Sequence, residues 1–572
     1  MKTGLFTCML LSLVCILFIR DVEAEDVAEK SSIRLEQIPD VNQSERLLPL
    51  PGLKENKNEP AFELPDAAEE PDKGDLSSAV SIYIRKITFR GGTVFSEKEI
   101  DNITNPYINR NVSFMKIEKL RRTLSELYTK RGYVNSGVII PDQKVKDGEL
   151  VFQATEGRLS EIAVEGNKQL SKTYIADRIR LHTEEPLNVG ELQTSLRLLL
   201  QSPSIKDLRA ELLPAIGLGE SVLKIKVEEN RPFTLVIEGG NNHSTSIGSY
   251  GGDVYASYRN LFRAGDAING SFTLSEGLRD GTAEYVVPLS ARDTLLKIQY
   301  RQNTASIIEA PFEKLEIKSR VKTYGMTVSH PLYKTPEKEI NLGITTEMRQ
   351  SETFLLGRRF SFSEGTDDGK AGVFALRTFQ EWADRGQDHV LAARSTLSFG
   401  LRGFNSTIND SDTPDSRFIT WLLQFQAIKR PFNTKTKLIF RTDLQLSNDR
   451  LLPMEKLAVG GMDSVRGYRK NILVRDNGLF SSIELRIPIY GTDSRPEVVE
   501  VAPFLDYASA WNTKSSTPEP RNISGAGVGI RWAVTSDILF QIYGAKAFRN
   551  VYTYEKDLQD KGVYFKLTAR IF

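Results

Sequence analysis

The stretch GVYFKLTARIF, residues 562–572, alternates between apolar and polar side chains. The apolar set falls on one face of an extended chain: Val563, Phe565, Leu567, Ala569 and Ile571. The polar set falls on the other face: Tyr564, Lys566, Thr568 and Arg570. A period of two is that of a β-strand with one apolar and one polar environment. The stretch KLIFRTDLQLS, residues 437–447, has the same pattern, with Ile439 as its exception.

Segments of this kind follow one another from residue 231 to residue 572, separated by polar loops rich in Gly, Asn and Asp. A soluble antiparallel sandwich would also alternate, but at this length it should contain several strands that are apolar on both faces. Here the polar face is densely charged in strand after strand, which is typical of a barrel with lipid outside and water inside. At roughly 20 residues per strand and loop, the region allows about 16 antiparallel strands, and roughly 14 or 18 fit the same arithmetic. We therefore predict a transmembrane β-barrel at residues 231–572.

The first 24 residues have the pattern of an export signal. A lysine at position 2 is followed by an apolar run from Leu5 to Ile19 and by a small-residue cleavage site that ends at Ala24. This pattern predicts a signal peptide at residues 1–24, and a retained anchor helix or a lipid anchor at Cys15 are the alternatives. Both cysteines of the chain, Cys8 and Cys15, lie in this segment. The exported chain would then have no disulfide, and it needs a large core or a membrane to hold its fold.

Residues 25–78 are predicted to form an N-terminal segment without a core. DVAEKSSIRLEQI, residues 26–38, could form one short helix. The stretch from residue 49 to residue 75 is rich in proline and in acidic residues, so it is predicted to be a linker.

Two units of one plan follow, at residues 79–157 and 158–230. In each, a strand precedes two helices and two further strands, so the order is β-α-α-β-β in roughly 75 residues. The first helix of the first unit begins after Ser96, and Glu99 completes a capping box. The second helix of the second unit carries a row of Leu196, Leu199 and Leu200, which either lines a groove for a partner or belongs to the core. The sequence thus predicts two small α/β modules in front of the barrel.

The first unit carries a family signature. RGYVNSGVIIPDQKVKDGELVFQATEGRL, residues 131–159, resembles the signature of a polypeptide-transport-associated (POTRA) module in two-partner secretion translocators. The residues that match the signature are Gly132, Tyr133, Pro141, Gln143, Gly148, Glu156 and Gly157. YRNLFRAGD, residues 258–266, resembles the second barrel strand of the same superfamily. Its matching residues are Asn260, Leu261, Gly265 and Asp266.

Two later stretches extend the resemblance into the barrel. LLPMEKLAVGGMDSVRGYRKN, residues 451–471, is similar to the family's sixth extracellular loop, whose tip is here Val465, Arg466, Gly467 and Tyr468. VAPFLDYASAW, residues 501–511, is similar to a later strand with an F-x-D core, here Phe504 and Asp506. In the family this loop folds back into the barrel lumen, and here it would cover about residues 453–475. The resemblance therefore implies that Arg466 meets Asp506 inside the barrel, with Tyr468 beside them.

The implied contact between Arg466 and Asp506 is physically reasonable. A guanidinium inside a partly dry channel needs a fixed carboxylate, because a buried and unpaired charge is costly. The planar fork of an arginine can also hold a carboxylate with two parallel hydrogen bonds, which fixes its orientation. Gly460, Gly461 and Gly467 would let the backbone turn tightly around the tip. A surface turn is the alternative for this Gly-rich stretch.

Taken together, the motifs make the chain similar to TpsB-type translocators, the haemolysin secretion/activation family. The resemblance implies a pore in the outer membrane of a Gram-negative bacterium, with two POTRA modules in the periplasm. The implied partners are a secreted exoprotein with an N-terminal secretion domain (TpsA-type), outer-membrane lipid, and the assembly machinery that inserts the barrel. An assembly factor for outer-membrane proteins, from the same superfamily, is the alternative. A passive porin is hard to reconcile with two modules.

Nothing in the sequence indicates catalysis, a metal or a cofactor. There is no G-x-x-x-x-G-K-[ST] loop for phosphate. The four histidines are scattered, with no second ligand at metal spacing: His182, His243, His330 and His389. Lys and Arg total 75 and Asp and Glu total 74, so the net charge of +1 gives no sign of nucleic-acid binding. We expect a transporter and not an enzyme.

Two features depart from the family pattern. Relatives plug the pore with a Gln-rich N-terminal helix, whereas residues 26–38 are short and poor in Gln, which puts the plug in doubt. Outer-membrane barrels commonly end in an aromatic residue that is recognised during insertion, and Phe572 supplies it. Strict alternation, however, places Phe572 with the polar set. Either the last residue turns outward or a bulge lies just before it.

Overall fold

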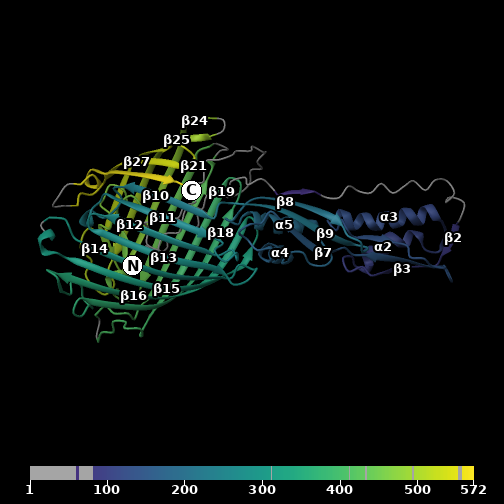
Figure 1. The fold of residues 1–572 in the computed structure, drawn as a ribbon, viewed down its shortest axis with the longest axis horizontal. Helices are drawn as coiled ribbons and strands as arrows, with labels where there is room; N and C mark the ends of the chain where they lie inside the picture. Colours follow the sequence, from purple (N-terminus) through teal and green to yellow (C-terminus); the bar gives the residue numbers. More distant parts are fainter. Residues whose placement is uncertain are drawn as a thin grey trace, which may run out of the picture.

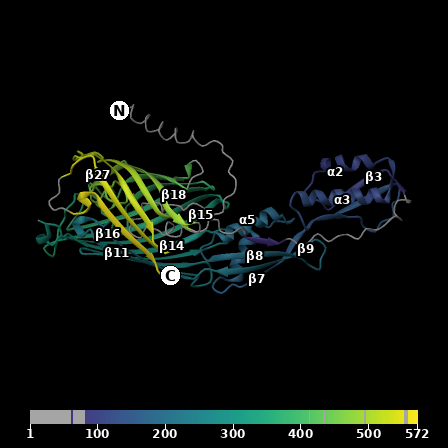
Figure 2. The ribbon, with the colours of Figure 1, turned by 90° about the horizontal axis from the view of Figure 1, so that it is seen from above.

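The structure, a computed structural model, describes residues 60–63, 81–310, 312–410, 413–431, 435–492, 495–551 and 557–572. It consists of a closed barrel and two small α/β modules, which lie in a row beyond one end of the barrel (Figures 1 and 2). The predicted signal peptide and the short helix at residues 26–38 lie outside the described residues. Within the described part of the chain, no helix is long and apolar enough to cross a membrane.

The barrel is one antiparallel sheet that closes on itself. In the described residues, sixteen strands follow one another around it in chain order, and the two-residue strand β17 (Arg358–Arg359) pairs only with β16. The sixteen strands are β10 (Phe233–Gly240), β11 (Gly251–Arg259), β12 (Ala267–Ser275), β13 (Leu278–Pro288), β14 (Leu295–Ser306), β15 (Lys318–Lys334), β16 (Lys338–Leu355), β18 (Lys370–Arg385), β19 (His389–Leu401), β20 (Ile419–Lys429), β21 (Lys437–Ser447), β24 (Asn477–Thr492), β25 (Arg495–Trp511), β26 (Asn522–Ala533), β27 (Ile538–Ala547) and β28 (Val563–Arg570). The prediction of about 16 antiparallel strands is confirmed.

The barrel strands bury their polar face and expose their apolar face. On β21 the side chains of Lys437 and Asp443 are buried, whereas Leu438 and Leu446 are each 38% exposed. The polar face is therefore turned to the lumen and the apolar face is turned outward. Ile439, the exception in the sequence pattern, lies on the inner face and packs against one residue each of β19 and β20. An apolar side chain is tolerated there because its neighbours are apolar too.

The first and last barrel strands, β10 and β28, meet along a seam. Their backbones pair over five residues of each strand. Beyond this ladder, Nδ2 of Asn241 donates to the carbonyl oxygen of Val563 at 2.9 Å, and its Oδ1 accepts from the N–H of Phe565 at 2.8 Å. The side chain of Gln559 donates to the carbonyl oxygens of Asn241 and His243 at 2.6 and 2.7 Å. The seam is therefore hydrogen-bonded well past the end of its backbone ladder.

Phe572 leaves the alternation because β28 ends at Arg570. Its ring centroid lies 5.9 Å from that of Phe233, which is exposed on the outer face of β10. The register of β28 against both of its neighbours shows no bulge. Of the two options left open by the sequence, the last residue turns outward. Its role as an insertion signal stays a prediction.

The first module lies farther from the barrel than the second (Figure 1). Its elements are β2 (Ser81–Ile84), β3 (Lys86–Arg90), α2 (Glu97–Thr104), β4 (Arg110–Ser113), α3 (Phe114–Lys130), β5 (Gly137–Ile139) and β6 (Glu149–Thr155). Helix α3 packs on the sheet β3-β6-β5 through a buried stripe that includes Ile117 and Leu124. The capping box of Ser96 and Glu99 is present, and hydrogen bonds from Arg131 and Ser96 lower the pKa of Glu99 to about 2. Strand β4, which pairs with β2, is an addition to the expected β-α-α-β-β order.

The second module keeps the β-α-α-β-β order. Its elements are β7 (Arg158–Glu165), α4 (Lys172–Arg180), α5 (Val189–Leu200), β8 (Ile205–Pro214) and β9 (Glu220–Glu229). The leucine row of α5 belongs to the core, because Leu196, Leu199 and Leu200 are all at most 4% exposed. The alternative, a groove lined by these leucines, is therefore wrong.

Within the predicted linker the structure describes residues 60–63, and these differ from expectation. Ala61–Glu63 forms a strand, β1, which pairs in parallel with β8 at the edge of the second module's sheet. Phe62 packs against the core of that module. An exposed sheet edge offers unpaired backbone groups to any extended segment nearby, so a short apolar stretch in the linker can add to it.

Candidate functional site

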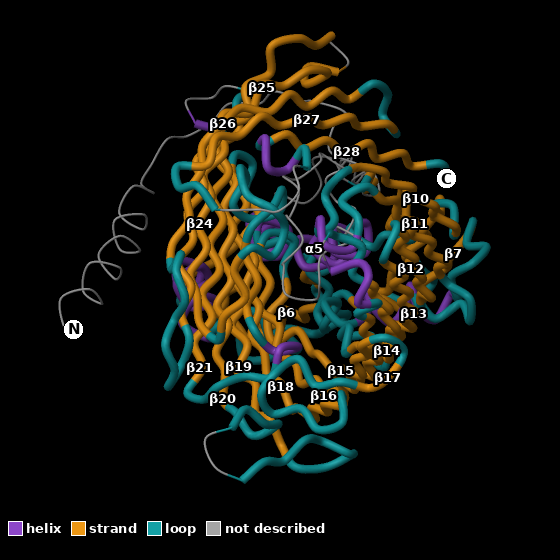
Figure 3. Tube along the Cα trace, turned by 90° about the vertical axis from the view of Figure 1, so that its left-hand side faces the viewer, coloured by secondary structure: helices purple, strands orange, loops and turns teal. Residues whose placement is uncertain are grey.

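The loop between β21 and β24 enters the barrel. Its two legs form a short ribbon in which β22 (Leu457–Val459) pairs with β23 (Leu473–Arg475), and residues 460–472 form the loop tip. Figure 3 looks into the barrel from the end away from the modules and shows chain segments inside the ring of strands. Val465 is fully buried and Tyr468 is 4% exposed. The tip is therefore not a surface turn.

Arg466 at the loop tip binds Asp506 on β25. Its Nε donates to Oδ2 of Asp506 at 2.8 Å and its Nη2 donates to Oδ1 at 2.9 Å. The backbone N–H of Arg466 also donates to Oδ2, at 3.0 Å. Asp506 is fully buried, while its neighbour Leu505 is 50% exposed, so Asp506 points into the lumen. The contact that the resemblance implies is present, in the two-pronged geometry that fixes a guanidinium.

Three further wall residues also contact Arg466. Its Nη1 donates to Glu484 on β24, and its Nη2 donates to Oγ of Ser482 at 3.3 Å. The ring of Phe504 lies 3.4 Å from the guanidinium carbon, a cation–π contact. Phe504 is the first residue of the F-x-D core, so the motif supplies both the carboxylate and the ring. Glu484 and Ser482 were missed, because only the strand register places them opposite the motif.

The tip is also tied to the last barrel strand. The N–H of Gly467 donates to the hydroxyl of Tyr564 on β28 at 2.8 Å, and this hydroxyl donates to the carbonyl oxygen of Tyr468 at 2.7 Å. Gly467 has φ +100°, and a Cβ there would lie 2.9 Å from the backbone nitrogen of Ala547. Tyr468 itself donates to the carbonyl oxygen of Ser524 at 3.1 Å. Tyr468 therefore anchors the tip to β26, and Tyr564 is a tip contact that the sequence did not reveal.

Arg469 joins the tip to two other loops. Its Nε and Nη2 donate to the carboxylate of Asp560 at 2.6 and 2.7 Å, and its Nη1 donates to Glu309. Asp560 precedes β28, and Glu309 lies between β14 and β15. The predicted loop glycines lie at the start of the tip: Gly460 has φ +120° and Gly461 has φ +94°. Both conformations disfavour any other residue.

The POTRA signature residues build the first module and its junction with the second. Oε1 of Gln143 accepts from the N–H of Val151 at 2.8 Å, and its Nε2 donates to the carbonyl oxygen of Val151 at 2.8 Å. The same Nε2 lies 3.3 Å from the carbonyl oxygen of Pro141. The amide side chain of Gln143 thus takes the place of a neighbouring strand beside β6. Tyr133 packs against the core of this module.

The glutamate and the glycines of the signature hold loops in place. Glu156 accepts from Thr93, Val94 and Tyr128. Burial acts to raise the pKa of Glu156, but the hydrogen bonds from Thr93, Val94 and Tyr128 outweigh it and the pKa is lowered. The carbonyl oxygens of two signature glycines accept from N–H groups of the second module. These bonds run from Val189 to Gly132 at 2.9 Å and from Leu187 to Gly157 at 2.7 Å.

Replacing Gln143 with Ala is expected to loosen the outer edge of the first module. The change removes three hydrogen bonds and leaves the N–H and C=O of Val151 without their partner, at a cost of about 1–3 kcal/mol. Hydrogen exchange at Val151 in the full chain is expected to accelerate at least fivefold. The matched control is Gln201→Ala, whose side chain bonds only the barrel-side Pro336 in the described residues. Unchanged exchange in Gln143→Ala would contradict the assigned role.

The second module docks on the near rim of the barrel. In the turn between β11 and β12, Asp266 is fully buried and accepts from the N–H groups of Phe262 and Ala264. Gly265 in this turn has φ +80°, and a Cβ there would lie 2.2 Å from the ring of Tyr174 on α4. The YRNLFRAGD motif therefore forms the turn on which α4 rests.

An ion-pair hub reinforces this docking. Asp293, in the turn between β13 and β14, binds Arg178 of α4 at 2.7 Å and Lys334 of β15 at 2.6 Å. Burial acts to raise the pKa of Asp293, but the two cations outweigh it and hold the pKa below its ordinary value. The carboxylate therefore stays charged throughout the neutral range. The pair of Asp293 and Arg178 thus links the barrel to the second module, and Lys334 of the barrel holds Asp293 in place.

Comparison with known proteins identifies the family. A family model described as haemolysin secretion/activation protein ShlB/FhaC/HecB matches residues 219–532, and one described as POTRA domain, ShlB-type, matches residues 82–157. The chain is 22% identical over 559 residues to the outer membrane transporter CdiB of Dickeya dadantii, with 93% of each protein covered. It is 20% identical over 485 residues to the heme/hemopexin transporter protein HuxB of Haemophilus influenzae, covering 79% of this chain and 81% of HuxB.

Two solved structures share the fold. CdiB from Escherichia coli superposes with a TM-score of 0.63 at 19% identity, covering 88% of this chain and 93% of CdiB. BamA from Haemophilus ducreyi lacking POTRA domains 1–3 superposes with a TM-score of 0.53 at 14% identity, covering 86% of this chain and 100% of that one. The family and the sequence relatives CdiB and HuxB are transporters. The first family model spans more than half of the 572 residues. The chain therefore belongs to the haemolysin secretion/activation family ShlB/FhaC/HecB, whose members are outer-membrane transporters of two-partner secretion.

Proposed function

We propose that the chain exports one unfolded exoprotein from the periplasm to the cell surface through the barrel lumen. The observation that carries this proposal is the loop tip, which Arg466 holds against Asp506 on the inner wall. The second module is docked at the periplasmic end of the same lumen. A chain that passes along the barrel axis must pass both features. We assign the pair of Arg466 and Asp506 to control of this path.

The first module is the proposed site of first contact with the exoprotein. The leucines of its helix α3 lie in the module core or pack against it, so they offer no groove. Three large apolar side chains on β2 and at the start of α3 are, however, about half exposed: Tyr83 (50%), Phe114 (46%) and Met115 (52%). Exposed apolar groups of this kind favour contact with an extended, unfolded chain. The partner would carry the N-terminal secretion domain that characterises exoproteins of this class.

The alternative, an assembly factor for outer-membrane proteins, is disfavoured by the seam. A chain that enters the membrane sideways has to leave the lumen through the barrel wall, and the junction of β10 and β28 is the natural place. There the buried amides of Asn241 and Gln559 extend the hydrogen bonding beyond the backbone ladder. A sealed seam supports passage along the axis.

Two further partners belong to the proposal. The outward face of the barrel strands is apolar, so outer-membrane lipid surrounds it. The outer-membrane assembly machinery inserts the barrel, with Phe572 as the proposed insertion signal.

A comparison of proteomes with and without the gene tests the function. Culture supernatant and outer membrane are analysed in parallel, and complementation with the wild-type gene is the control. Loss of one large secreted protein, with the other barrel proteins unchanged, is expected and identifies the cargo. A general fall in outer-membrane barrels would show an assembly factor and refute export.

A further inference from the structure

The stem of the inward loop has an anchor of its own, separate from the tip. Glu455 lies in the one-turn helix η6 (Pro453–Glu455), and its side chain is 2% exposed. Both of its carboxylate oxygens accept from Nη2 of Arg377 on β18, at 2.9 and 3.0 Å. Nη1 of Arg349 on β16 lies 3.4 Å from the same carboxylate and donates to the carbonyl oxygen of Met454 at 2.9 Å. Two arginines of the barrel wall therefore bind the one-turn helix at the start of the loop.

A second wall carboxylate balances this cluster. Glu347 on β16 is 3% exposed and lies 2.8 Å from both Arg349 and Arg377. The cluster thus contains two cations and two carboxylates. Removal of one member from a buried, balanced group leaves an uncompensated charge, which is far more costly than the loss of an exposed pair. We name this group, Glu347, Arg349, Arg377 and Glu455, the stem clamp.

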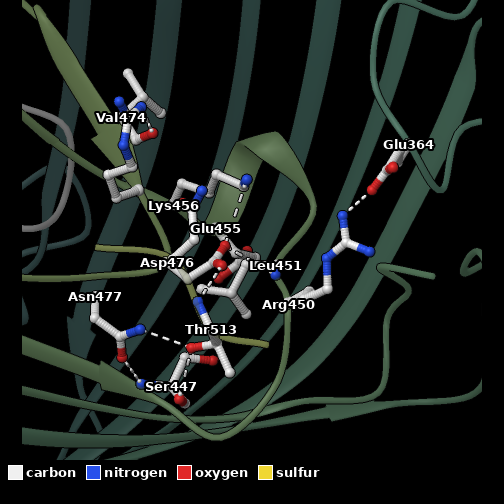
Figure 4. A network of polar contacts seen from close by, with 12 residues as sticks. Glu364, Ser447, Arg450, Leu451, Glu455, Lys456, Val474, Asp476, Asn477 and Thr513 are labelled. Atoms are coloured by element: carbon white, nitrogen blue, oxygen red, sulfur yellow. Dashed lines mark hydrogen bonds and ion pairs between the residues drawn. The ribbon is translucent and has the colours of Figure 1, made fainter. Parts of the chain in front are cut away.

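The returning leg of the loop is fixed at its root, close to Glu455 of the stem clamp (Figure 4). Asp476 is 1% exposed. It accepts from the N–H of Leu451 at 3.1 Å and from the N–H of Thr513 at 2.9 Å, and it pairs with Lys456 at 3.4 Å. In Figure 4, Asp476 lies among these three residues, whereas the pair of Arg450 and Glu364 lies apart from them. Both legs of the loop are therefore tied to the wall before the tip begins.

The stem clamp and the tip contact lie on different parts of the wall. The stem is held on β16 and β18, and the tip is held on β24 and β25, with β19, β20 and β21 between them around the barrel. The loop crosses part of the lumen between these two holds. The chain from Glu455 to Arg466 includes Gly460 and Gly461, whose left-handed backbone sets the direction of the tip. If the stem end of this span moves, Arg466 no longer falls opposite Asp506.

We propose that Glu455 is a positioning residue of the transporter: through the stem clamp it fixes the loop stem so that Arg466 reaches Asp506. This inference rests on the proposed function of the tip. It also divides the loop into a fixed stem and a movable tip. The tip, residues 460–472, can leave the barrel wall during export while the stem stays in place.

The test measures access to the stem with a single cysteine. The chain's two cysteines lie in the predicted signal peptide, so Val459→Cys, at a buried position of β22, would be the reactive thiol of the exported chain. A membrane-impermeant maleimide is applied to intact cells. In a Glu455→Gln background, the labelling rate of this cysteine is expected to rise at least tenfold, and exoprotein secretion is expected to fall at least fivefold.

The matched control makes the same change on the same side of the barrel. Glu364 pairs with Arg450 of the loop, but its side chain is 66% exposed. Because an exposed pair contributes little, Glu364→Gln is expected to leave labelling and secretion unchanged. Labelling and secretion by Glu455→Gln equal to those of Glu364→Gln would overturn the proposal. A second control places the cysteine at Val236, a buried position of β10 outside the loop. If Glu455→Gln raised the labelling rate of Val236→Cys as much as that of Val459→Cys, the whole barrel would be loosened and the proposal would be overturned.

A second substitution separates positioning from simple packing. Arg377→Gln alone leaves one cation with two carboxylates, whereas Glu455→Gln combined with Arg377→Gln leaves one of each. Because both changes break the same contact, the double variant is expected to label no faster and to secrete no less than Glu455→Gln alone. A double variant worse than both single variants would overturn the charge balance on which the clamp depends. Normal export by Arg466→Ala would refute the role of the tip, while labelling at Val459→Cys would still report on the clamp.

Discussion

Arg466→Ala is expected to lower secretion of the exoprotein at least tenfold while the barrel remains inserted. The change leaves Asp506 and Glu484 buried on the wall without the cation that joins them. Removal of one partner from a buried ion pair costs about 3–5 kcal/mol, so the tip loses its place on β25. The measurement is the amount of exoprotein in the culture supernatant. It is normalised to the amount of folded barrel in the outer membrane, which is determined from the heat-dependent shift of the barrel in gel electrophoresis.

Arg450→Ala is the matched control for this change. Arg450 lies in the same loop, but its partner Glu364 is exposed, so secretion is expected to stay within twofold of wild type. Asp506→Asn is expected to reproduce the defect of Arg466→Ala. Because both changes break one contact, the double variant is expected to be no worse than either single variant. A loss in the double variant much larger than the sum would argue against a direct pair, and normal export by Arg466→Ala would refute the role of the tip.

Gly265→Val is expected to be the most damaging change outside the lumen. A valine at φ +80° is strained, and its Cβ would lie 2.2 Å from the ring of Tyr174. The second module would have to move away from the rim, which also separates Arg178 from Asp293. Secretion is expected to fall at least tenfold. A disulfide between Ser171→Cys and Arg263→Cys, whose backbones are joined by a 3.0 Å hydrogen bond, is expected to form in wild type and fail in Gly265→Val.

Gly357→Val isolates the effect of the clash. Gly357 has φ +76°, but no atom lies within 4 Å of a Cβ built there. Valine at position 357 would therefore cause a backbone strain similar to that of valine at position 265, but it would not clash with the second module. Secretion by this control is expected to stay near the wild-type level. Equal secretion by Gly265→Val and Gly357→Val would show that docking on this turn is not needed for export.

The fold was accessible from the sequence because its dominant signal is local. Alternation along KLIFRTDLQLS and GVYFKLTARIF depends only on neighbouring residues and on which side faces lipid. The contact of Arg466 with Asp506 could be named in advance because a family motif marks both ends. In contrast, the strand at Ala61–Glu63 was not predicted, because the surrounding sequence has the composition of a linker. This segment forms a strand because it pairs with the edge strand β8, and not because of its own sequence.

The remaining lumen contacts could not be read from the sequence, because barrel register decides them. Glu484 faces Arg466 only because β24 and β25 pair with Ser482 opposite Asp506. Arg377 meets Glu455 across 78 residues, and Arg469 meets Glu309 across 160 residues. No local pattern marks such partners, since the strand tilt and stagger of the closed barrel bring them together. A charged residue on the lumen face predicts an ion pair but not its partner.

The seam between β10 and β28 makes completion of this barrel a single late event. The bond between Thr568 and Glu238 joins residues 330 positions apart. The other neighbouring strands are joined by far shorter connections, of which the inward loop between β21 and β24 is the longest. The entropy lost on closing a loop grows with its length, and contacts of high sequence separation form slowly. Until closure, the sheet has two bare edges whose backbone groups find no water in the bilayer, so an open intermediate has to be shielded. Asn241 and Gln559 gain their partners only when the ring shuts, and their buried amides then make reopening slow.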